Sequence, residues 1–344
     1  MKKQLIAFLI AALLLCGCTI TIEPVPTQTT PPAGSGLTVH FLDVGQADSI
    51  LLECGGQYML IDGGNVDDGQ FVVSYLEKAG VEELSYVVCT HAHEDHVGGL
   101  ASVLAVFPAQ TVFSPTTTYA SRCFDDFLYY VDQQRIEITI PAPGDTFTLG
   151  QAEVTVLGPV KSYAETNDTS IVLRVEYGSN SFLFTGDMES LAENDMLDHG
   201  AYVQADVLKA GHHGSSSSTS YRFLYEVNPT YTVISCGIDN SYGHPHDEVV
   251  SRFHDAGVPM FRTDELGTIV AFSDGSEITF TWERQQNQPA EVAPASAQYI
   301  GNVNSHKFHQ SDCSGLPAEK NRVYFDSYLE AIGAGYTPCS SCMP

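Results

Sequence analysis

Three histidines and an aspartate lie within six consecutive residues, His91-Ala-His93-Glu-Asp95-His96. The H-x-H-x-D-H spacing brings imidazole and carboxylate groups close enough to converge on one point. Neutral imidazole nitrogens and carboxylate oxygens are ligands of Zn²⁺, and of Mn²⁺ where oxygen ligands dominate. A polar loop that is rich in histidine by chance is the competing interpretation, and the regular spacing argues against it. The motif therefore predicts a metal site.

The segments on either side of the motif indicate how it is held. Leu84 to Thr90 is an apolar run typical of a buried strand, and Val97 to Leu104 has the character of a helix start. The motif therefore lies on a tight loop between a strand and a helix, where neighbouring side chains can point at the same ion.

Other acidic and histidine residues follow apolar, strand-like runs elsewhere in the chain. Taken singly each is weak evidence, because an aspartate before glycine is most often a turn former and a lone histidine is most often structural. Their order after the H-x-H-x-D-H motif makes them a candidate site. They are Asp43, Asp62, Asp187, His212, His213, His244 and His246.

In this order the motifs resemble those of the metallo-β-lactamase superfamily, and more closely the metallo-β-lactamase-like domain of the ComEC DNA-uptake proteins. The resemblance covers about residues 37–284. It implies an α/β (α+β) fold, a four-layer αβ/βα sandwich, with a two-metal site at the edge of the sheets. The matching stretches are His40–Asp48, Leu60–Gly64, Thr90–Gly99, Asn167–Ser170, Thr185–Asp187, Asp206–Ser215 and Tyr242–Pro245.

The resemblance also implies a role for each matching residue. The ligands it implies are His91 and His93 for one ion, Asp95, His96 and one histidine of His212–His213 for the other, and Asp187 as the bridge. Such a pair of Zn²⁺ or Mn²⁺ ions suits hydrolysis of a phosphodiester or an acyl bond.

Three further roles are assigned around these ligands. Asp43 and Asp62 are expected to orient ligand histidines rather than to bind metal. Asp95 counts as a catalytic residue as well as a ligand. His244 is the candidate general acid, with a substrate-positioning role as the alternative.

One departure from the superfamily pattern concerns the first ion. The superfamily has another ligand histidine before the bridging aspartate, but no histidine occurs from Val97 to Asp198. Asn167 to Ser170 matches a segment that the ComEC-like members carry there. Asp168 or Asn167 is expected to supply an oxygen ligand, or the first ion is bound weakly. An oxygen in place of a nitrogen would favour Mn²⁺.

The charge balance weighs against nucleic acid as a substrate. The chain has 15 Lys and Arg against 42 Asp and Glu, a formal net charge of −27. This charge repels polyanions at long range. Metal ions and local basic patches act at short range, so a nucleic-acid substrate is disfavoured but not excluded.

The N-terminus predicts export and anchoring. Met1 to Gln4 is basic, Leu5 to Leu15 is apolar, and Leu15-Cys-Gly-Cys18 resembles the lipobox of bacterial lipoproteins. This implies residues 1–18 as a signal peptide, lipid on Cys18, and residues 19–36 as a flexible tether. A plain secretory signal or a short anchor is the alternative. The protein is expected outside the cytoplasm, attached to the membrane.

A Gln- and Pro-rich linker, residues 285–297, precedes a small module, residues 298–344. Two short pairs of ligands, H-x₃-C and C-x₂-C, fit a closed tetrahedral zinc that would stabilise so small a module. One disulfide plus a free thiol is the alternative. Cys54, Cys89 and Cys236 lie in strand-like runs and are expected to be buried thiols. The zinc ligands are His309, Cys313, Cys339 and Cys342.

Phe308 to Cys313 and Asn321 to Cys342 resemble the metal-binding domain of the Ada DNA-repair proteins. The first ligand of that family is a cysteine that accepts methyl groups. His309 stands in its place, so the resemblance implies zinc binding without methyl transfer. It also implies contact with a DNA backbone, for which Lys307, Lys320 and Arg322 form a modest basic patch. A structural or wall-binding role competes.

The leading hypothesis is a surface lipoprotein that acts as a metal-dependent phosphodiesterase on extracellular DNA. The first alternative is the same chemistry on another phosphodiester, such as phosphocholine on a cell-wall polymer, which the acidity favours. The second is a non-catalytic DNA-binding competence lipoprotein, which the intact ligand motif disfavours.

Overall fold

The computed structural model of the protein describes residues 36–284, 299–310, 313–325 and 328–343. The predicted signal peptide with Cys18, nearly all of the predicted tether and the predicted linker lie outside these residues.

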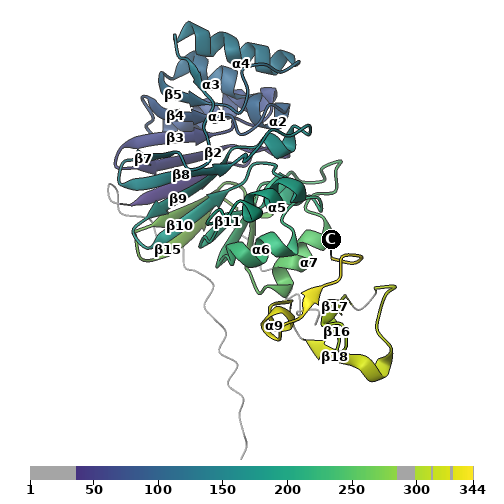
Figure 1. The fold of residues 1–344 in the computed structure, drawn as a ribbon. Helices are drawn as coiled ribbons and strands as arrows, with labels where there is room; N and C mark the ends of the chain where they lie inside the picture. Colours follow the sequence, from purple (N-terminus) through teal and green to yellow (C-terminus); the bar gives the residue numbers. More distant parts are fainter. Residues whose placement is uncertain (1–35, 285–298, 311–312, 326–327, 344) are drawn as a thin grey trace, which may run out of the picture.

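Two mixed β-sheets form the centre of the main domain (Figure 1). The first has eight strands in the order β15 (Ile278–Trp282), β14 (Ile269–Ser273), β1 (Leu37–Phe41), β2 (Ile50–Cys54), β3 (Gln57–Ile61), β4 (Leu84–Val88), β5 (Ala109–Phe113) and β6 (Ile138–Thr139). The second has seven in the order β13 (Met260–Arg262), β12 (Tyr231–Ile234), β11 (Val207–Lys209), β10 (Asn180–Phe184), β9 (Val172–Tyr177), β8 (Ala152–Gly158) and β7 (Thr146–Leu149).

Alternating side chains form the apolar core between the sheets. In β1, Leu37, Val39 and Phe41 are buried and the residues between them are half-buried, the period of two that a strand produces. Phe41 lies 6.2 Å, centroid to centroid, from Phe184 of β10, so the two sheets pack directly on each other. Each large apolar side chain buried in this way stabilises the fold by about 1.5–3 kcal/mol.

Helices cover the outer face of each sheet (Figure 1). The helices α1 (Gly69–Lys78), α3 (Leu100–Val106) and α4 (Arg122–Gln133) share one apolar cluster with the first sheet. The helices α5 (Ser190–Asp198), α6 (Tyr221–Val227) and α7 (Asp247–Asp255) share another with the second sheet. The layers therefore run helix, sheet, sheet, helix, which confirms the four-layer αβ/βα fold.

The helix α4 shows how local sequence fixes one of these layers. Phe124, Phe127 and Val131 recur at helical spacing and are buried. The hydroxyl of Ser121 accepts a hydrogen bond from the backbone N–H of Phe124, which caps the first turn.

Parallel strand pairing places the chemically active segments at one edge. In the first sheet β3 pairs in parallel with β4, and in the second β10 pairs in parallel with β11. The carboxyl ends of parallel strands meet at the same edge of a sheet, where ligands bind in α/β folds. The H-x-H-x-D-H motif, Asp187 and the His212–His213 pair all follow such ends.

The C-terminal residues form a smaller sheet, which lies near α7 in Figure 1. Its order is β18 (Arg322–Phe325), β16 (Tyr299–Asn302), β17 (Lys307–His309) and β19 (Thr337–Pro338), with α9 (Tyr328–Gly333) beside it. Its apolar core includes Tyr299, Phe308 and Met343, and Tyr221 of α6 belongs to the same cluster. The module therefore packs against the main domain.

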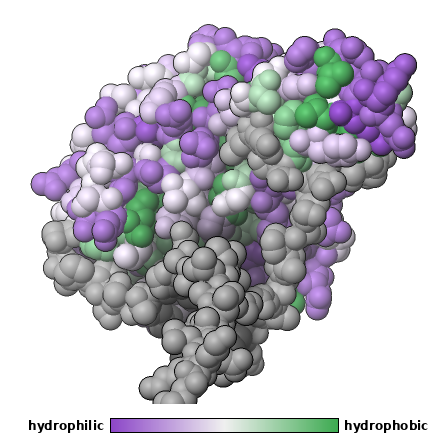
Figure 2. All heavy atoms as spheres, turned by 90° about the horizontal axis from the view of Figure 1, so that it is seen from below, coloured by the Kyte–Doolittle hydropathy of each residue, from purple (hydrophilic) through white to green (hydrophobic). Residues whose placement is uncertain are grey.

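Among the coloured residues of the face shown in Figure 2, most are polar, and the apolar ones form small groups. Within the described ranges, no helix has the length and apolarity that crossing a membrane requires.

Candidate metal centre

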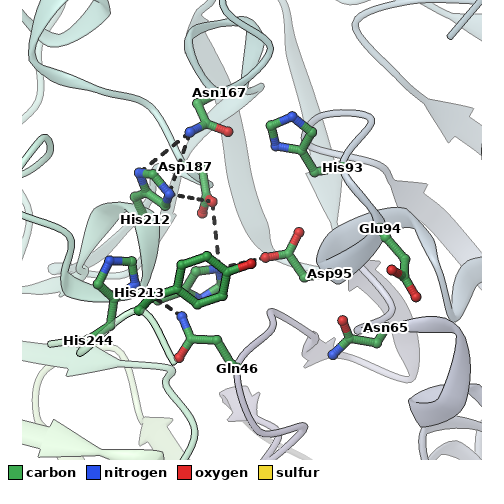
Figure 3. Close-up of a pocket in the computed structure, with 11 residues that line it drawn as sticks. Gln46, Asn65, His93, Glu94, Asp95, Asn167, Asp187, His212, His213 and His244 are labelled. Carbon is green, nitrogen blue, oxygen red and sulfur yellow. Dashed lines mark hydrogen bonds and ion pairs between the residues drawn. The ribbon is translucent and has the colours of Figure 1, made fainter. Parts of the chain in front are cut away.

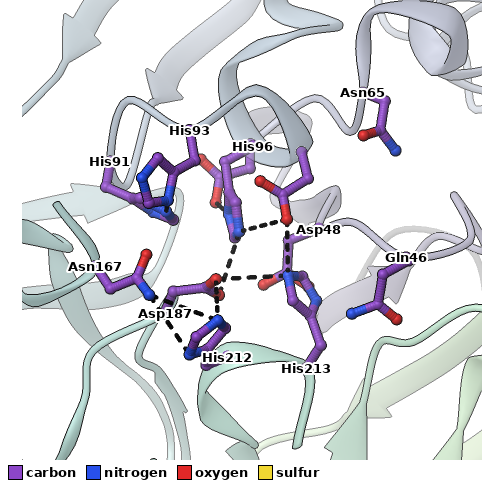
Figure 4. Close-up of polar contacts among 12 residues, drawn as sticks. Gln46, Asp48, Asn65, His91, His93, His96, Asn167, Asp187, His212 and His213 are labelled. Carbon is purple, nitrogen blue, oxygen red and sulfur yellow. Dashed lines mark hydrogen bonds and ion pairs between the residues drawn. The ribbon is translucent and has the colours of Figure 1, made fainter. Parts of the chain in front are cut away.

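Loops from both sheets bring the candidate ligands together. The H-x-H-x-D-H motif follows β4, and α2 (Glu94–Val97) begins inside it. Asp187 follows β10, and the short 3₁₀ turn Gly211–Gly214 follows β11. Figure 4 shows histidines from these loops arranged around Asp187.

Asp95, His96, Asp187 and His213 form the tightest cluster. One ligand atom from each lies within 4.8 Å of those of the others. His96 Nε2 is 3.2 Å from Asp187 Oδ1, and His213 Nε2 is 3.3 Å from Asp95 Oδ2. Of the two adjacent histidines, His213 is thus the one that joins Asp95 and His96.

A second group lies beside this cluster. His91 Nε2 is 3.1 Å from His93 Nδ1, and the ring centroids of His91 and His96 are 4.2 Å apart. His212 Nε2 lies 3.7 Å from Asp187 Oδ2, while Asp187 Oδ1 faces His96. Asp187 therefore contacts both groups, the position that a bridging carboxylate requires. Burial lowers the pKa of His91 well below its usual value, which keeps its imidazole neutral and able to bind metal.

Unsatisfied polar atoms in this cluster fit the binding of a cation. Four buried atoms make no hydrogen bond of normal geometry with any residue that the structure describes: His96 Nε2, His213 Nε2, Asp187 Oδ1 and Asp48 Oδ1. A buried polar atom without a partner lowers the stability of the fold unless a bound ligand interacts with it. Burial opposes a charge on His96, yet Asp187, Asp62 and Asp95 raise its pKa well above its usual value. The same negative field attracts a divalent ion, so the residues fit the implied metal pair.

Asp62 orients one of the ligands. Its carboxylate lies 2.8 Å from His96 Nδ1 and accepts hydrogen bonds from the N–H and hydroxyl of Thr90 at 2.8 and 2.7 Å. His96 is therefore held with Nε2 toward the cluster. This carboxylate–histidine contact is the arrangement that fixes metal ligands in proteins.

A buried ion pair that the sequence analysis did not single out supports His213. Asp48 Oδ2 accepts a hydrogen bond from Lys209 Nζ at 2.9 Å, and Asp48 Oδ1 lies 3.5 Å from His213 Nδ1. The carbonyl of Ser235 lies 3.1 Å from the same nitrogen. The signal for this pair is a lysine at the end of the short apolar strand β11, because a fully buried lysine needs a charged partner.

The expectation for Asp43 is corrected. Its carboxylate forms an ion pair with Arg284 and accepts from the N–H of Gly45, so it contacts no histidine. The loop after β1 turns Asp43 toward the end of β15 and Asp48 toward His213.

The expectation for Asp168 is also corrected. Asp168 is buried, and its Oδ1 accepts a hydrogen bond from the backbone N–H of Glu189 at 3.1 Å, next to the start of α5. Its carboxylate is therefore used to hold the backbone there, and Asp168 is not among the residues that line the pocket. Asn167, the alternative, lies on the pocket wall with Nδ2 3.5 Å from His212 and 3.1 Å from Glu189 Oε1. Glu189 also lies 3.2 Å from His212 Nδ1. The oxygen beside His212 therefore comes from Glu189, and Asn167 turns its amide nitrogen toward the same histidine.

The cluster opens into a pocket of about 550 Å³ (Figure 3). His244 lies on its wall, where burial first and the neighbouring histidines next lower its pKa to about 4. Gln46 Oε1 accepts the N–H of Gly237, which turns its amide NH₂ toward His244 Nδ1 at 3.1 Å. His244 is therefore neutral at pH 7 with its proton on Nε2. His246 accepts from the N–H of Ser216 instead.

The C-terminal ligands also converge. His309, Cys313, Cys339 and Cys342 offer ligand atoms within 4.8 Å of one another, and all three thiols are free. His309 Nδ1 is 3.3 Å from Cys313 Sγ. Burial would raise the pKa of Cys339, but the N–H groups of Ser341 and Cys342 outweigh it and lower this pKa. The donor set therefore fits a tetrahedral zinc. Cys54, Cys89 and Cys236 are buried free thiols.

Residues 42–238 match the model of a protein family described as the metallo-beta-lactamase superfamily. The chain is 28% identical over 250 residues to ComE operon protein 3 of Bacillus subtilis, which covers 67% of this chain and 32% of that protein. It is 30% identical over 263 residues to competence protein ComA of Neisseria gonorrhoeae, covering 75% and 35%. It is 31% identical over 274 residues to recombination protein 2 of Haemophilus influenzae, covering 76% and 32%.

The chain thus spans about a third of the length of these relatives. Among solved structures it is similar to the metallo-beta-lactamase fold protein YhfI of Bacillus subtilis, with 14% identity, a TM-score of 0.48, and coverage of 69% of this chain and 100% of that one.

Proposed function

Because the chain belongs to the metallo-beta-lactamase superfamily of metal-dependent hydrolases, we propose that it hydrolyses phosphodiester bonds and that its substrate is DNA. We further propose that it acts outside the cytoplasm, anchored by lipid on Cys18. The observation that carries the proposal is the cluster around Asp187, whose unsatisfied nitrogens and oxygens open into the pocket.

The residues divide the work of such a site. Asp95, His96 and His213 would hold one divalent ion, His91 and His93 would contribute to the other, and Asp187 would bridge them. Two such ions supply Lewis acidity, lower the pKa of water and stabilise charge on the attacking and leaving oxygens. Glu189 would supply an oxygen ligand beside His212, a histidine that Asn167 contacts through its amide nitrogen.

His244 positions substrate in this proposal. Its Nδ1 accepts from Gln46, so its Nε2 carries a proton that can be donated to an oxygen of the substrate. A pKa of about 4 makes the imidazolium scarce at pH 7. The neutral N–H therefore favours positioning over general-acid catalysis.

The relatives support DNA as the substrate class. Two of them carry names that refer to competence and recombination, which are processes of DNA. The C-terminal module adds Lys307, Lys320 and Arg322 as a basic patch on an otherwise acidic chain. The ions and this patch act at short range, where the net charge of −27 matters less.

The test is cleavage of single- and double-stranded DNA by the purified protein loaded with Mn²⁺ or Zn²⁺. We expect metal-dependent cutting that falls by at least about 100-fold in Asp95→Ala and His96→Ala, since loss of an orienting partner alone costs about 10–100-fold. Asp43→Asn is the matched control, because that carboxylate pairs with Arg284 and should leave cutting unchanged. Intact DNA after incubation with fully loaded protein contradicts the proposal.

One observation favours a second substrate. The net charge is −27, and neither lysine nor arginine occurs among the described residues that line the pocket. A phosphodiester on a less anionic carrier, such as phosphocholine on a wall polymer, would approach more easily. Choline release by the metal-loaded protein, without DNA cutting, would establish this activity instead.

A further inference from the structure

An exposed aromatic ring lies at the rim of the pocket. Tyr242 lines the pocket and is 68% exposed. Its ring stacks on His244 with centroids 5.7 Å apart and planes at 25°. The His244 ring is in turn 5.5 Å from that of His212, so one ring separates Tyr242 from the residues around Asp187. A bound group at the cluster therefore has an aromatic surface as its neighbour.

Hydrogen bonds fix the loop that carries Tyr242. Asn240 Nδ2 donates to the carbonyl of Gly237 at 2.9 Å, and Asn240 Oδ1 accepts the N–H of His244 at 2.9 Å. The N–H of His246 donates to the carbonyl of Gly214 at 2.9 Å, which ties the loop to the turn bearing His213. The backbone that carries the exposed ring is therefore fixed before substrate arrives, and the ring itself rests on His244, which reduces the entropy lost on binding.

The remaining wall leaves little else to recognise a nucleotide. Amides such as Gln46 and Asn65 and the carboxylate of Glu94 lie around it (Figure 3). Among the described residues of this wall there is neither Lys nor Arg, so no side-chain cation pairs with a second phosphate. An aromatic face, by contrast, binds any base through its π-surface. A cationic headgroup is bound by a cage of several aromatic rings. Among the described residues that line the pocket, Tyr242 is the single tyrosine, and neither Phe nor Trp occurs, so such a cage is not formed.

We propose that Tyr242 is the stacking platform for the base of a nucleotide whose phosphate lies at the Asp187 cluster. The proposal rests on the proposed function for the position of the phosphate. A base inside a duplex has both faces covered by its neighbours, so the platform selects single-stranded or unpaired nucleotides. Tyr242 is thus a specificity-determining residue.

Calorimetric titration of the full, metal-loaded protein tests the platform apart from turnover. The ligands are deoxyadenosine 5′-monophosphate, inorganic phosphate and phosphocholine. In Tyr242→Ala we expect affinity for the nucleotide to fall roughly 5- to 150-fold, the range for loss of one stacked base, with phosphate binding unchanged. Tyr242→Phe should keep the affinity of the wild type, because the ring remains. Ile238→Ala, an exposed apolar residue of the same loop outside the pocket lining, is the matched control.

Equal nucleotide affinity in the wild type and Tyr242→Ala overturns the inference, and so does a loss confined to phosphocholine. If the nucleotide effect holds but no DNA is cut, the DNA-cleavage proposal fails while the platform stands. If DNA is cut, Tyr242→Ala should raise KM for single-stranded DNA by a similar factor and leave kcat nearly unchanged, since the ring contacts the base and not the reacting atoms.

Discussion

Asp187 is the residue on which the site converges. One oxygen faces His96 and the other faces His212 and His213, and burial leaves it 2% exposed. Burial would raise the pKa of this carboxyl, but His96 and His213 hold it well below its usual range. An ionised carboxylate with a histidine on either side is what a bridging ligand between two cations needs.

Asp62 and Asp43 give a matched test of orientation at the residue scale. Asp62→Asn replaces the carboxylate that holds His96, so we expect metal affinity and activity to fall about 10–100-fold. Asp43→Asn removes a charge of the same type that contacts Arg284 and no histidine, so it should change neither. Metal affinity is measured by competition with a chromogenic chelator. Equal affinities in the two variants would contradict the orienting role.

Lys209 is the residue-scale test of the buried ion pair. Its side chain is 1% exposed, so Lys209→Met leaves Asp48 charged and buried without its partner. Breaking such a pair costs about 3–5 kcal/mol of unfolding free energy. The control is Lys161→Met, whose ammonium pairs with Asp195 but is 52% exposed, for which about 0–1 kcal/mol is expected. Urea unfolding followed by circular dichroism measures both, and similar losses would refute the argument.

At the scale of elements, the turn after β11 carries the largest backbone irregularity of the site. His212 and His213 have φ of 50° and 54°, a left-handed region that side chains seldom adopt. Each such residue costs of the order of 1–3 kcal/mol and persists only where its surroundings enforce it. Gly211, at the start of the turn, donates its N–H to the Thr219 hydroxyl at 3.2 Å, and α5 and α7 hold the segment around Thr219. Arg252 of α7 donates to the carbonyls of Ser218 and Thr219 at 2.8 and 3.1 Å.

Glu193 of α5 makes the support of this turn sensitive to pH. It is fully buried, accepts from the N–H groups of Thr219 and Ser220 and faces Arg252, and burial raises its pKa to about 7 from 4.5. The folded state therefore binds the proton more tightly than the unfolded chain does. Its contribution to stability is full below about pH 4.5 and is lost as pH rises to about 7, a change of about 3 kcal/mol.

Urea unfolding at pH 5 and pH 8 of the wild type and Glu193→Gln checks this window. The glutamine is neutral at every pH, so the wild type should lose about 2.5 kcal/mol more between the two pH values than the variant does. Identical pH dependence in both proteins would show that Glu193 has an ordinary pKa.

The sequence predicts contacts within one loop better than contacts between distant segments. The ligands of the H-x-H-x-D-H motif lie on one loop, so their spacing alone shows that they can meet. Asp48 and Lys209 meet only because β11 and the loop before β2 lie at the same edge, and no spacing along the chain shows that. Asp168 and Asn167 are adjacent, and only the backbone of the turn decides which one faces the pocket. The layers were predictable because motif order identifies the family, whereas the strained turn was not.

For the molecule as a whole, the two candidate metal sites have no residue in common, but packing connects their domains. Tyr299 of the module and Tyr221 of α6 have hydroxyls 3.0 Å apart, and both contact Asp255 of α7. Gln310, next to His309, donates to the Tyr221 hydroxyl at 3.2 Å. The module therefore rests on the two helices that follow the histidine-bearing loops. We expect unfolding of the module to lower the stability of these two helices and to have a smaller effect on the chemistry at Asp187.

Cys339→Ser tests this independence. A closed tetrahedral site that loses one thiolate binds zinc much more weakly, and so small a module depends on its metal for folding. We expect the variant to lose one equivalent of zinc by mass spectrometry of the purified protein, to unfold at a lower temperature, and to keep the metals around Asp187. Cys123→Ser, a half-buried thiol of α4 outside both sites, should keep the full metal content. Zinc content equal to that of the wild type in Cys339→Ser would mean that the module holds no metal, and its four converging side chains would then require another explanation.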